Sequence, residues 1–503
     1  MNRDGNNESI WQHTSLNTRH NGNIEENKVY DVVVAGAGIT GVTTAMLLQQ
    51  AGKDVLLAEA KNIAFGTTGG TTAHLNTFFD SSYDKVIKDF GLENAKLFAE
   101  AGKESMEFIR QQVATGDIDC EYEEKTGYLF SVEEKQNEIL DKLVEGAKKV
   151  DVEIDYTNES PFPVPYLKIA SMPRQAQFNP VKYIEALLQI FLDNGGTFVE
   201  NCRVTGTDEA EIITVKTTVG NVRTRNLFYA THIPPGVNIM HFRNAPYRSY
   251  AIAVKLEGDK YPQALGYDLC DPYHYYRSQK IDGEEYLIAG GEDHKTAHEK
   301  DTEQCFRNLE TYVRKFFSVK SVSYKWSSQY YIPADGLPYI GYLPGSRENV
   351  YAATGFNGDG MILGTLSAII IRDLIVSNKS KYGELFNPAR VKPVAGFTDF
   401  VKEAADVVAH FIGDKLKVKK IEALTELAAG EAKLVKYEGD TLAVYKDERG
   451  EVHAVNSACT HIKCNVSWNN TEQSWDCPCH GSRFNADGEL LTGPARKDLE
   501  KLM

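Results

Sequence analysis

Four cysteines and two histidines stand close together near the C-terminus of the sequence. A first group contains Cys459 and His461, and a second contains Cys477 and His480. Thiolate and imidazole groups bind transition metals, and two of each suit either zinc or an iron–sulfur cluster. A zinc finger would place a helix under its histidines, whereas both groups here lie among short predicted strands and glycines. The stretch therefore predicts a metal centre.

The pattern around these residues, CTHIKC…WDCPCHGSRF with a trailing DGELLTGPA, resembles the Rieske [2Fe–2S] proteins over residues 417–503. The resemblance implies that Cys459 and Cys477 bind one iron of the cluster, and that His461 and His480 bind the other. Two neutral imidazoles in place of two thiolates make such a cluster less negative and easier to reduce.

Further positions in this stretch match the respiratory-type Rieske proteins. There the cysteines that match Cys464 and Cys479 form a disulfide that braces the cluster loops, so the resemblance implies the same bond here; two free thiols in a reducing cytosol are the alternative. Ser482 matches a serine whose hydroxyl donates to a cluster sulfur. Phe484 stands where a tyrosine often does the same, so we expect a lower reduction potential than in those members.

A glycine-rich turn, GAGITG at residues 36–41, lies between a predicted strand and a predicted helix, and Glu59 ends the next strand. Glycines allow the main chain to approach a pyrophosphate at a helix N-terminus, and the carboxylate can accept hydrogen bonds from ribose hydroxyls. This context predicts a dinucleotide site without choosing between NAD and FAD.

Two later segments, DGLPYIG and ATGFNGDGMILG, resemble the closing part of the D-amino-acid-oxidase-like FAD oxidoreductases, and the resemblance runs from about residue 30 to 375. It implies non-covalently bound FAD. The cofactor-binding positions that it implies, together with the glycine turn, are Gly36, Gly38, Ile39, Thr40, Gly41, Glu59, Thr67, Thr68, Val204, Thr231, Asp335, Gly358, Gly360 and Met361.

The substrate pocket departs from this family. Its amino-acid-oxidising members carry an arginine before the DG-x-P segment, where SQYYIPADGLP has Tyr330 and Tyr331 instead. Arg277 is the candidate for a carboxylate clamp, or else a partner for an acidic side chain. Tyr276 and Tyr330 are candidates for the pocket, where tyrosines could surround a cationic amine through cation–π contacts, or else they belong to the core.

A possible mononuclear iron site lies in the same region. His294 and His298, with Glu292 and Asp293 beside them, offer two histidines and a carboxylate. The segment YLIAGGEDH is itself what the FAD family has at this position, so we do not expect iron here.

The elements that must position these groups predict an α/β fold with three parts. We expect an FAD-binding Rossmann-like domain of the glutathione-reductase type, a β-rich substrate domain and a small all-β C-terminal Rieske domain. The predicted boundaries are a disordered or extended tail at 1–28, the oxidoreductase at 29–378 (FAD-binding segments about 29–90, 175–235 and 330–378, substrate-domain segments about 91–174 and 236–329), a linker and connector helix at 379–416, and the Rieske domain at 417–503.

Composition excludes several classes of protein. The 503 residues are 42% hydrophobic and 25% charged, with a net charge of −15, and no segment concentrates Lys and Arg, so nucleic-acid binding is not expected. The longest apolar run, Met361–Ile371, is shorter than the roughly 20 residues that span a bilayer. The N-terminus has neither a basic start nor an apolar stretch typical of a signal peptide. We therefore expect a cytoplasmic protein without a transmembrane segment.

The two resemblances together imply a function. We expect an FAD-dependent dehydrogenase that oxidises an amine or amino-acid-like substrate at CH–NH or CH–NH2 by hydride transfer. One-electron transfer would follow to the Rieske [2Fe–2S] cluster and on to an external acceptor, either a protein or a quinone. The alternative is an electron-transfer or reductase flavo-iron–sulfur protein with no amine substrate.

Overall fold

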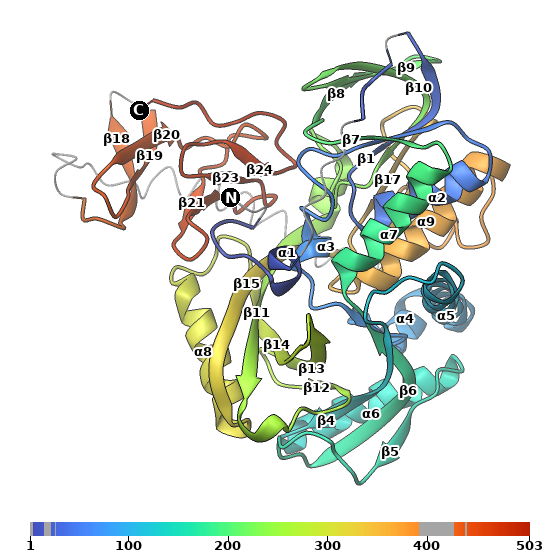
Figure 1. Cartoon of the computed structure of the whole chain (residues 1–503), viewed down its shortest axis with the longest axis vertical. Coiled ribbons are helices and arrows are strands. Elements are labelled where there is room, and N and C mark those ends of the chain that lie inside the picture. The colour runs from blue at the N-terminus through green and yellow to red at the C-terminus, as the bar shows by residue number, and fades with distance from the viewer. Residues whose placement is uncertain (1–3, 15–21, 26, 392–426, 438–439, 503) are drawn as a thin grey trace.

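The structure is a computed structural model that describes residues 4–14, 22–25, 27–391, 427–437 and 440–502. Figure 1 shows a sheet with helices packed against it, a second large sheet beside it, and a small β region that contains the C-terminus. The predicted fold class is confirmed, because an α/β part built on two sheets is followed by a separate all-β part.

The first sheet is built from short apolar runs that are buried on both faces. β1 (Val29–Ala35) lies between β2 (Val55–Ala58) and β10 (Gly220–Tyr229) in parallel register. Such runs are typical of parallel sheets covered by helices, and α2 (Ile39–Gln50) packs against α7 (Pro180–Asp193) here. The other strands are β7 (Thr197–Val199), β8 (Val204–Asp208), β9 (Ile213–Thr217), β16 (Tyr339–Tyr342) and β17 (Val350–Thr354).

Helix α9 (Gly360–Ser377) closes this part of the protein and contacts both α2 and α5 (Leu92–Thr115). Among the described residues, α9 is the one helix that is long enough and apolar enough to cross a membrane. However, 67% of that stretch is buried inside the protein, as expected for a core helix.

The second sheet has nine strands and carries the aromatic residues that the sequence concentrates between residues 245 and 295. Its path runs β15-β11-β14-β13-β12-β4-β6-β3, with β5 paired to β6. These strands are β3 (His74–Leu75), β4 (Glu123–Ser131), β5 (Asp155–Thr157), β6 (Lys168–Gln177), β11 (Asn244–Leu256), β12 (Leu265–Asp268), β13 (His274–Ile281), β14 (Glu284–Lys295) and β15 (Val319–Pro333). Its accompanying helices are α4 (Tyr83–Phe90), α6 (Glu134–Lys149) and α8 (Thr302–Phe316).

The C-terminal β region consists of a three-stranded and a four-stranded sheet, both antiparallel. The two cysteine–histidine groups occupy the loops that precede β21 and β23. The strands are β18 (Ala432–Tyr437), β19 (Asp440–Lys446), β20 (Val452–Asn456), β21 (Ser467–Asn469), β22 (Ser474–Asp476), β23 (Arg483–Asn485) and β24 (Leu490–Thr492).

The N-terminal segment corrects a prediction, because residues 4–14 are not a free tail. They contain a short helix, α1 (Ile10–His13), with Ser9 as its N-cap. Trp11 is fully buried, and its Nε1 donates to the carbonyl oxygen of Thr71 at 2.7 Å. Figure 1 places α1 beside β15. A buried tryptophan and a capped helix hold this segment in place, and neither stands out in a polar sequence of this length.

Asp4 joins the flavin-type part to the C-terminal region. Its carboxylate accepts from Arg248 Nη2 on β11 and from Arg483 Nη1 on β23, each at 3.2 Å, and all three residues are buried. Gly5 follows with φ +123°, and a Cβ there would lie 2.4 Å from the carbonyl oxygen of Glu472, so only glycine fits. The N-terminal segment therefore lies between the two domains.

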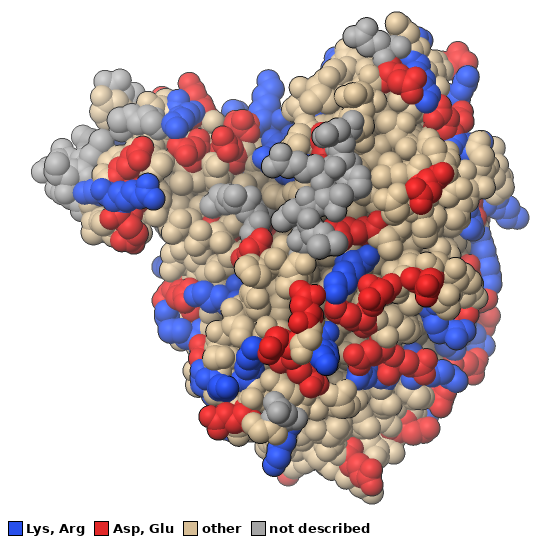
Figure 2. Space-filling view, viewed as in Figure 1, with Lys and Arg blue, Asp and Glu red and all other residues tan. Residues whose placement is uncertain are grey.

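The predicted connector helix falls within residues 392–426, outside the described residues. The preceding segment is described, and in it Arg390 forms a buried ion pair with Asp335 at 2.7 Å. Charges elsewhere are mixed: on the face seen in Figure 2, Lys and Arg are interspersed with Asp and Glu.

Candidate functional site

A long cavity begins at the glycine turn after β1. Gly36 has φ +105°, and a Cβ on it would lie 2.6 Å from the carbonyl oxygen of Ala230, so this turn requires glycine. The N-terminus of α2 opens onto the cavity, and the amide of Ile39 donates to Thr68 Oγ1 at 3.0 Å. Gly41 lies behind the turn, where a Cβ would meet the carbonyl oxygen of Gly36 at 1.8 Å.

Glu59 directly follows β2 at the same cavity, with Val204 also in the wall. Its two oxygens accept main-chain hydrogen bonds from Ala37 at 2.8 Å and Lys61 at 3.0 Å. Burial raises the pKa of this carboxyl, although these amide donors oppose the shift. A carboxylate retains acceptor capacity beyond two bonds, so Glu59 can still receive a ribose hydroxyl.

The remaining predicted cofactor positions divide into two groups. The structure brings most of them to the cavity wall, while Asp335 lies outside it because Arg390 binds both of its carboxylate oxygens, at 2.7 and 2.8 Å. The predicted residues that line the cavity are Gly36, Gly38, Ile39, Thr40, Glu59, Thr67, Thr68, Val204, Thr231, Gly358, Gly360 and Met361. A glycine cradle, a helix N-terminus and a strand-end carboxylate along one elongated cavity fit the FAD dinucleotide.

A second cavity shares Thr67, Thr71, Tyr330 and Gly358 with the first, so the two adjoin. Its wall is aromatic and acidic, and no Lys or Arg occurs among its described lining residues. The aromatic members are Phe78, Tyr250, Tyr267, Tyr273, Tyr275, Trp326 and Tyr330, and the acidic members are Asp80 and Asp359.

A third carboxylate, that of Asp293, lies behind this wall. Tyr330 donates to its Oδ2 at 3.4 Å, and its Oδ1 is buried without a hydrogen-bond partner among the described residues. Loss of hydration, followed by the nearby charge of Asp293, raises the pKa of Asp80 to about 7. Loss of hydration likewise raises the pKa of Asp293 to about 6, and the pKa of Asp359 is also raised. The cavity therefore holds carboxylates that titrate near neutral pH.

Two predicted pocket residues, Tyr276 and Arg277, do not line this cavity, which corrects the prediction. Tyr275 lines it, whereas Tyr276 on the opposite face of β13 is fully buried against the ring of Phe162. Arg277 is also fully buried, below the cavity, where it donates to two main-chain carbonyl oxygens at 2.5 and 3.3 Å and lies over the ring of Trp11. Of the three candidates, only Tyr330 is at the cavity.

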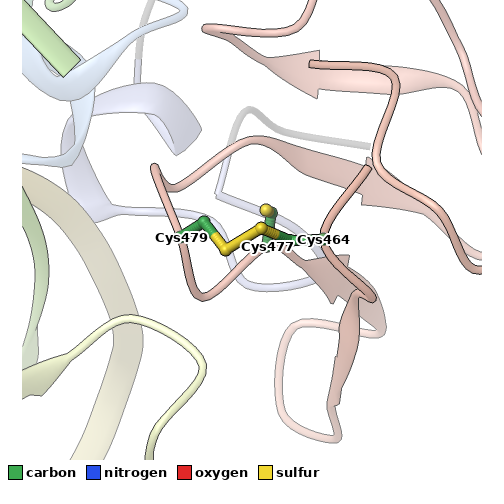
Figure 3. Close-up of side chains that lie close together, drawn as sticks. All are labelled: Cys464, Cys477 and Cys479. Carbon is green, nitrogen blue, oxygen red and sulfur yellow. A yellow bond between two sulfur atoms is a disulfide. The ribbon is translucent and has the colours of Figure 1, made fainter. Parts of the chain in front are cut away.

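The C-terminal loops bring the predicted cluster ligands together. Cys459 and Cys477 are buried free thiols, while Cys464 and Cys479 form the disulfide that was predicted. Figure 3 shows Cys477 beside this disulfide. The sulfur atoms of Cys464, Cys477 and Cys479 lie within 4.8 Å of one another.

The two histidines complete a donor set that fits a Rieske cluster. His461 Nε2 lies 3.2 Å from the carbonyl oxygen of Gly236, which can only accept, so Nε2 carries the proton and Nδ1 keeps its lone pair. The Nδ1 atoms of His461 and His480 are both buried without a hydrogen-bond partner among the described residues. Two buried thiols and two orphaned imidazole nitrogens are the ligands that such a cluster requires.

The histidine edge of this centre faces the flavin-type domain. The ring of His480 lies 5.7 Å from that of His241 and 5.4 Å from that of Phe242. Tyr331 donates to the main-chain oxygen of His480 at 3.2 Å. His241 and Phe242 carry no signal in the sequence, because only the docking of two separate domains places them at the centre.

Comparisons with known proteins agree with both sites. The family model described as FAD dependent oxidoreductase matches residues 31–374, and the Rieske [2Fe-2S] domain model matches residues 417–503. A Bacillus subtilis (strain 168) protein, YhfW, whose name describes a Rieske 2Fe-2S iron-sulfur protein, is 32% identical over 498 residues, which cover 98% of this chain and 97% of that protein.

Further relatives match the larger part of the chain. Gamma-glutamylputrescine oxidoreductase of Escherichia coli (strain K12) is 22% identical over 379 residues, covering 72% of this chain and 88% of that protein. The crystal structure of glycine oxidase from Geobacillus kaustophilus matches with a TM-score of 0.61 at 16% identity, over 72% of this chain and 99% of that chain. At this identity the structural match establishes the fold alone.

Proposed function

The chain belongs to the FAD dependent oxidoreductase family and ends in a Rieske [2Fe-2S] domain, and we propose that it oxidises a cationic amine and transfers the electrons to an external acceptor through its own Rieske cluster. Bound FAD accepts two electrons from a substrate C–H bond, and a Rieske cluster carries one electron at a time. The observation that carries the proposal is spatial: the aromatic cavity adjoins the dinucleotide cavity, and the cluster histidines contact the same domain.

The second cavity supports a cation as the substrate. Aromatic faces attract ammonium groups, and the carboxylates of Asp80 and Asp359 attract them further. A substrate carboxylate would face these acids with no Lys or Arg among the described lining residues to balance it. A relative named for gamma-glutamylputrescine supports an amine as the substrate class.

The carboxylates also provide a place for the substrate proton. An amine must lose its ammonium proton before a C–H bond next to the nitrogen can be oxidised. Asp80 and Asp293, with pKa values raised to about 7 and about 6, can hold this proton near neutral pH. His74 does not compete for it, because burial and then Arg277 lower its pKa to about 3.

The cluster supports a dehydrogenase in place of an oxidase. Its histidine edge is covered by residues of the flavin domain, so an electron can cross between the two centres without a diffusing partner. An enzyme with this exit does not need oxygen as the acceptor of its electrons.

The proposal is tested by mixing the anaerobic holoprotein with alkylamines, diamines, N-methyl amino acids and α-amino acids. Flavin absorbance and the EPR signal of the reduced Rieske cluster are followed together. We expect a cationic amine to bleach the flavin and then generate the EPR signal. Reduction of both centres by dithionite, but by no compound of the panel, would favour an electron carrier and refute the proposal.

Asp80→Asn provides a matched variant for the substrate claim. It should raise the KM for the amine about tenfold, because it removes one charge-assisted contact. Asp89→Asn, an exposed position on α4, is the control and should leave KM unchanged.

A further inference from the structure

We propose that the Rieske domain is part of the FAD-binding site, with residues 490–496 forming one wall of the dinucleotide cavity and Arg496 supplying positive charge to the anionic cofactor. We call these residues the closing segment. Six of them line the cavity together with the glycine turn and the later glycine-rich loop, namely Leu490, Leu491, Thr492, Gly493, Ala495 and Arg496.

The closing segment is attached on both sides. Within its own domain, the amide of Ala495 donates to Ser482 Oγ at 2.9 Å, in the loop that carries His480. Across the interface, the amide of Gly236 donates to the carbonyl oxygen of Pro494 at 2.9 Å. The wall that it forms is therefore tied both to the cluster loop and to the flavin domain.

The charge of the cavity depends on this segment. Among the described residues that line the cavity there are two arginines, Arg203 and Arg496, no lysine, and one acidic residue, Glu59. Arg203 belongs to the flavin domain, but its Nη2 donates to the carbonyl oxygen of Leu490 at 2.7 Å, so the closing segment orients it. The glycine turn offers amide dipoles without formal charge, whereas the pyrophosphate of FAD is anionic.

Arg496 has donor capacity left for a ligand. Its Nη2 donates to the carbonyl oxygen of Pro235 at 3.1 Å, which fixes the guanidinium at the interface. Its Nε is buried with no hydrogen-bond partner among the described residues. Arg496 lines the cavity, so its positive charge would attract an anionic group bound there, and its remaining guanidinium N–H groups could donate to that group.

FAD binding and docking of the Rieske domain should be thermodynamically coupled, because residues of both domains line the same cavity. If the closing segment contacts FAD, cofactor binding must favour the docked Rieske domain, and docking must raise cofactor affinity by the same factor. The flavin domain by itself would leave this part of the cavity open.

The test removes FAD from the full-length protein and titrates the apoprotein with FAD by flavin fluorescence. Arg496→Gln should raise the Kd for FAD about tenfold and weaken its dependence on ionic strength. Lys497→Gln is the matched control, because it removes the neighbouring charge from an exposed side chain that does not line the cavity. An unchanged Kd and salt dependence in Arg496→Gln would overturn the role of its charge.

A second readout does not depend on this variant. Amides of residues 490–496 in the wild-type protein should exchange with deuterium more slowly once FAD is bound, while β18 and β19 remain unchanged. Equal exchange with and without FAD would contradict the proposal that residues 490–496 form a wall of the FAD site. The Rieske EPR signal checks that each variant is folded; if Arg496→Gln loses this signal, Arg203→Gln takes its place, with the same expected rise in Kd and the same contradicting result.

Discussion

His461 and His241 come from different domains, yet their rings lie edge to face with centroids 4.6 Å apart and planes at 87°. His461 belongs to the metal centre, and His241 lies in the segment between the dinucleotide cavity and β11. Contacts between aromatic rings therefore connect the metal centre to the flavin-type domain.

Replacement of His241 should slow the transfer between the two centres. Its Nε2 donates to the carbonyl oxygen of Pro234 at 2.8 Å, and burial lowers its pKa to about 3, so the ring stays neutral and fixed. His241→Ala removes the ring that packs against both cluster histidines and should slow cluster reduction, with flavin reduction unchanged. Stopped-flow absorbance measures both phases. His453→Ala, on β20, is the control, and an unaltered second phase in His241→Ala would contradict the prediction.

The N-terminal segment should contribute to stability. Among the described residues, Asp4→Ala removes one of two carboxylates that contact the buried guanidinium groups of both Arg248 and Arg483, and leaves only Asp476 in contact with both. Removing one partner from a buried ion pair costs about 3–5 kcal/mol, so the free energy of unfolding in urea should fall by that order. Glu8→Ala, at an exposed position in the same segment, should change it little. A loss below about 1 kcal/mol in Asp4→Ala would mean that the segment does not hold the domains together.

Activity should rise with pH through the range in which the cavity carboxylates ionise. Asp80 and Asp293 have pKa values raised to about 7 and about 6, with Asp359 and Lys85 as charged neighbours of Asp80. Because a cation binds to the ionised forms, kcat/KM should increase between pH 5 and 8, and Asp80→Asn should flatten its upper part. A profile that is flat in the wild type would contradict this assignment.

The Asp80 carboxyl should make the free energy of unfolding decrease as pH rises, whereas it makes activity increase. The folded pKa of Asp80 lies above the ordinary value of 3.8, so between about pH 4 and 7 the folded protein binds more protons here than the unfolded chain. This group's contribution to stability therefore decreases as pH rises through that window. Asp80→Asn apoprotein should lose less stability over it than the wild type when unfolding is followed in urea.

The cluster potential should respond to hydroxyl groups in the β23 loop. Phe484 is fully buried in the same apolar cluster as Cys459 and Cys477, and it has no hydroxyl to donate to sulfur. Phe484→Tyr should raise the potential by about 60 mV, the equivalent of a hydrogen bond worth about 1.5 kcal/mol. Ser482→Ala should lower it, because the Ser482 hydroxyl lies within reach of Cys459. An EPR-monitored redox titration that finds no rise in Phe484→Tyr would contradict the expectation.

Local sequence was sufficient for the parts of each site that one short segment builds. The cluster ligands lie in two compact loops and the glycine turn follows directly from β1, so short motifs were sufficient for both: the resemblance to Rieske proteins implied the ligands, and the spacing of the glycines predicted the dinucleotide turn. Tyr276 does not line the cavity because it lies on the opposite face of β13, and which face borders the cavity depends on pairing with β12 and β14. Arg277 shares the face of Tyr275, but it is fully buried and its guanidinium donates to two main-chain carbonyl oxygens. Asp335 lies outside the cavity lining and pairs with Arg390, and this contact has no local signal because Arg390 comes from beyond α9.

Residues that act across the domain interface had no signal in the sequence. Asp4 and Trp11 lie in a polar stretch that reads as a tail, and their burial depends on domains that follow far along the chain. Arg496 resembles any surface arginine of a small β domain until that domain is docked on the cavity. Such roles arise from tertiary contacts between segments and not from local periodicity.

Electron transfer within one chain is tested by the dependence of cluster reduction on protein concentration. The anaerobic holoprotein is mixed with a reducing amine, and flavin absorbance and the Rieske EPR signal are followed over a tenfold range of protein. We expect the flavin to be reduced first and the cluster to follow with a first-order rate constant that does not depend on protein concentration. A rate that rises with concentration, or a cluster that stays oxidised, would contradict electron transfer within one chain.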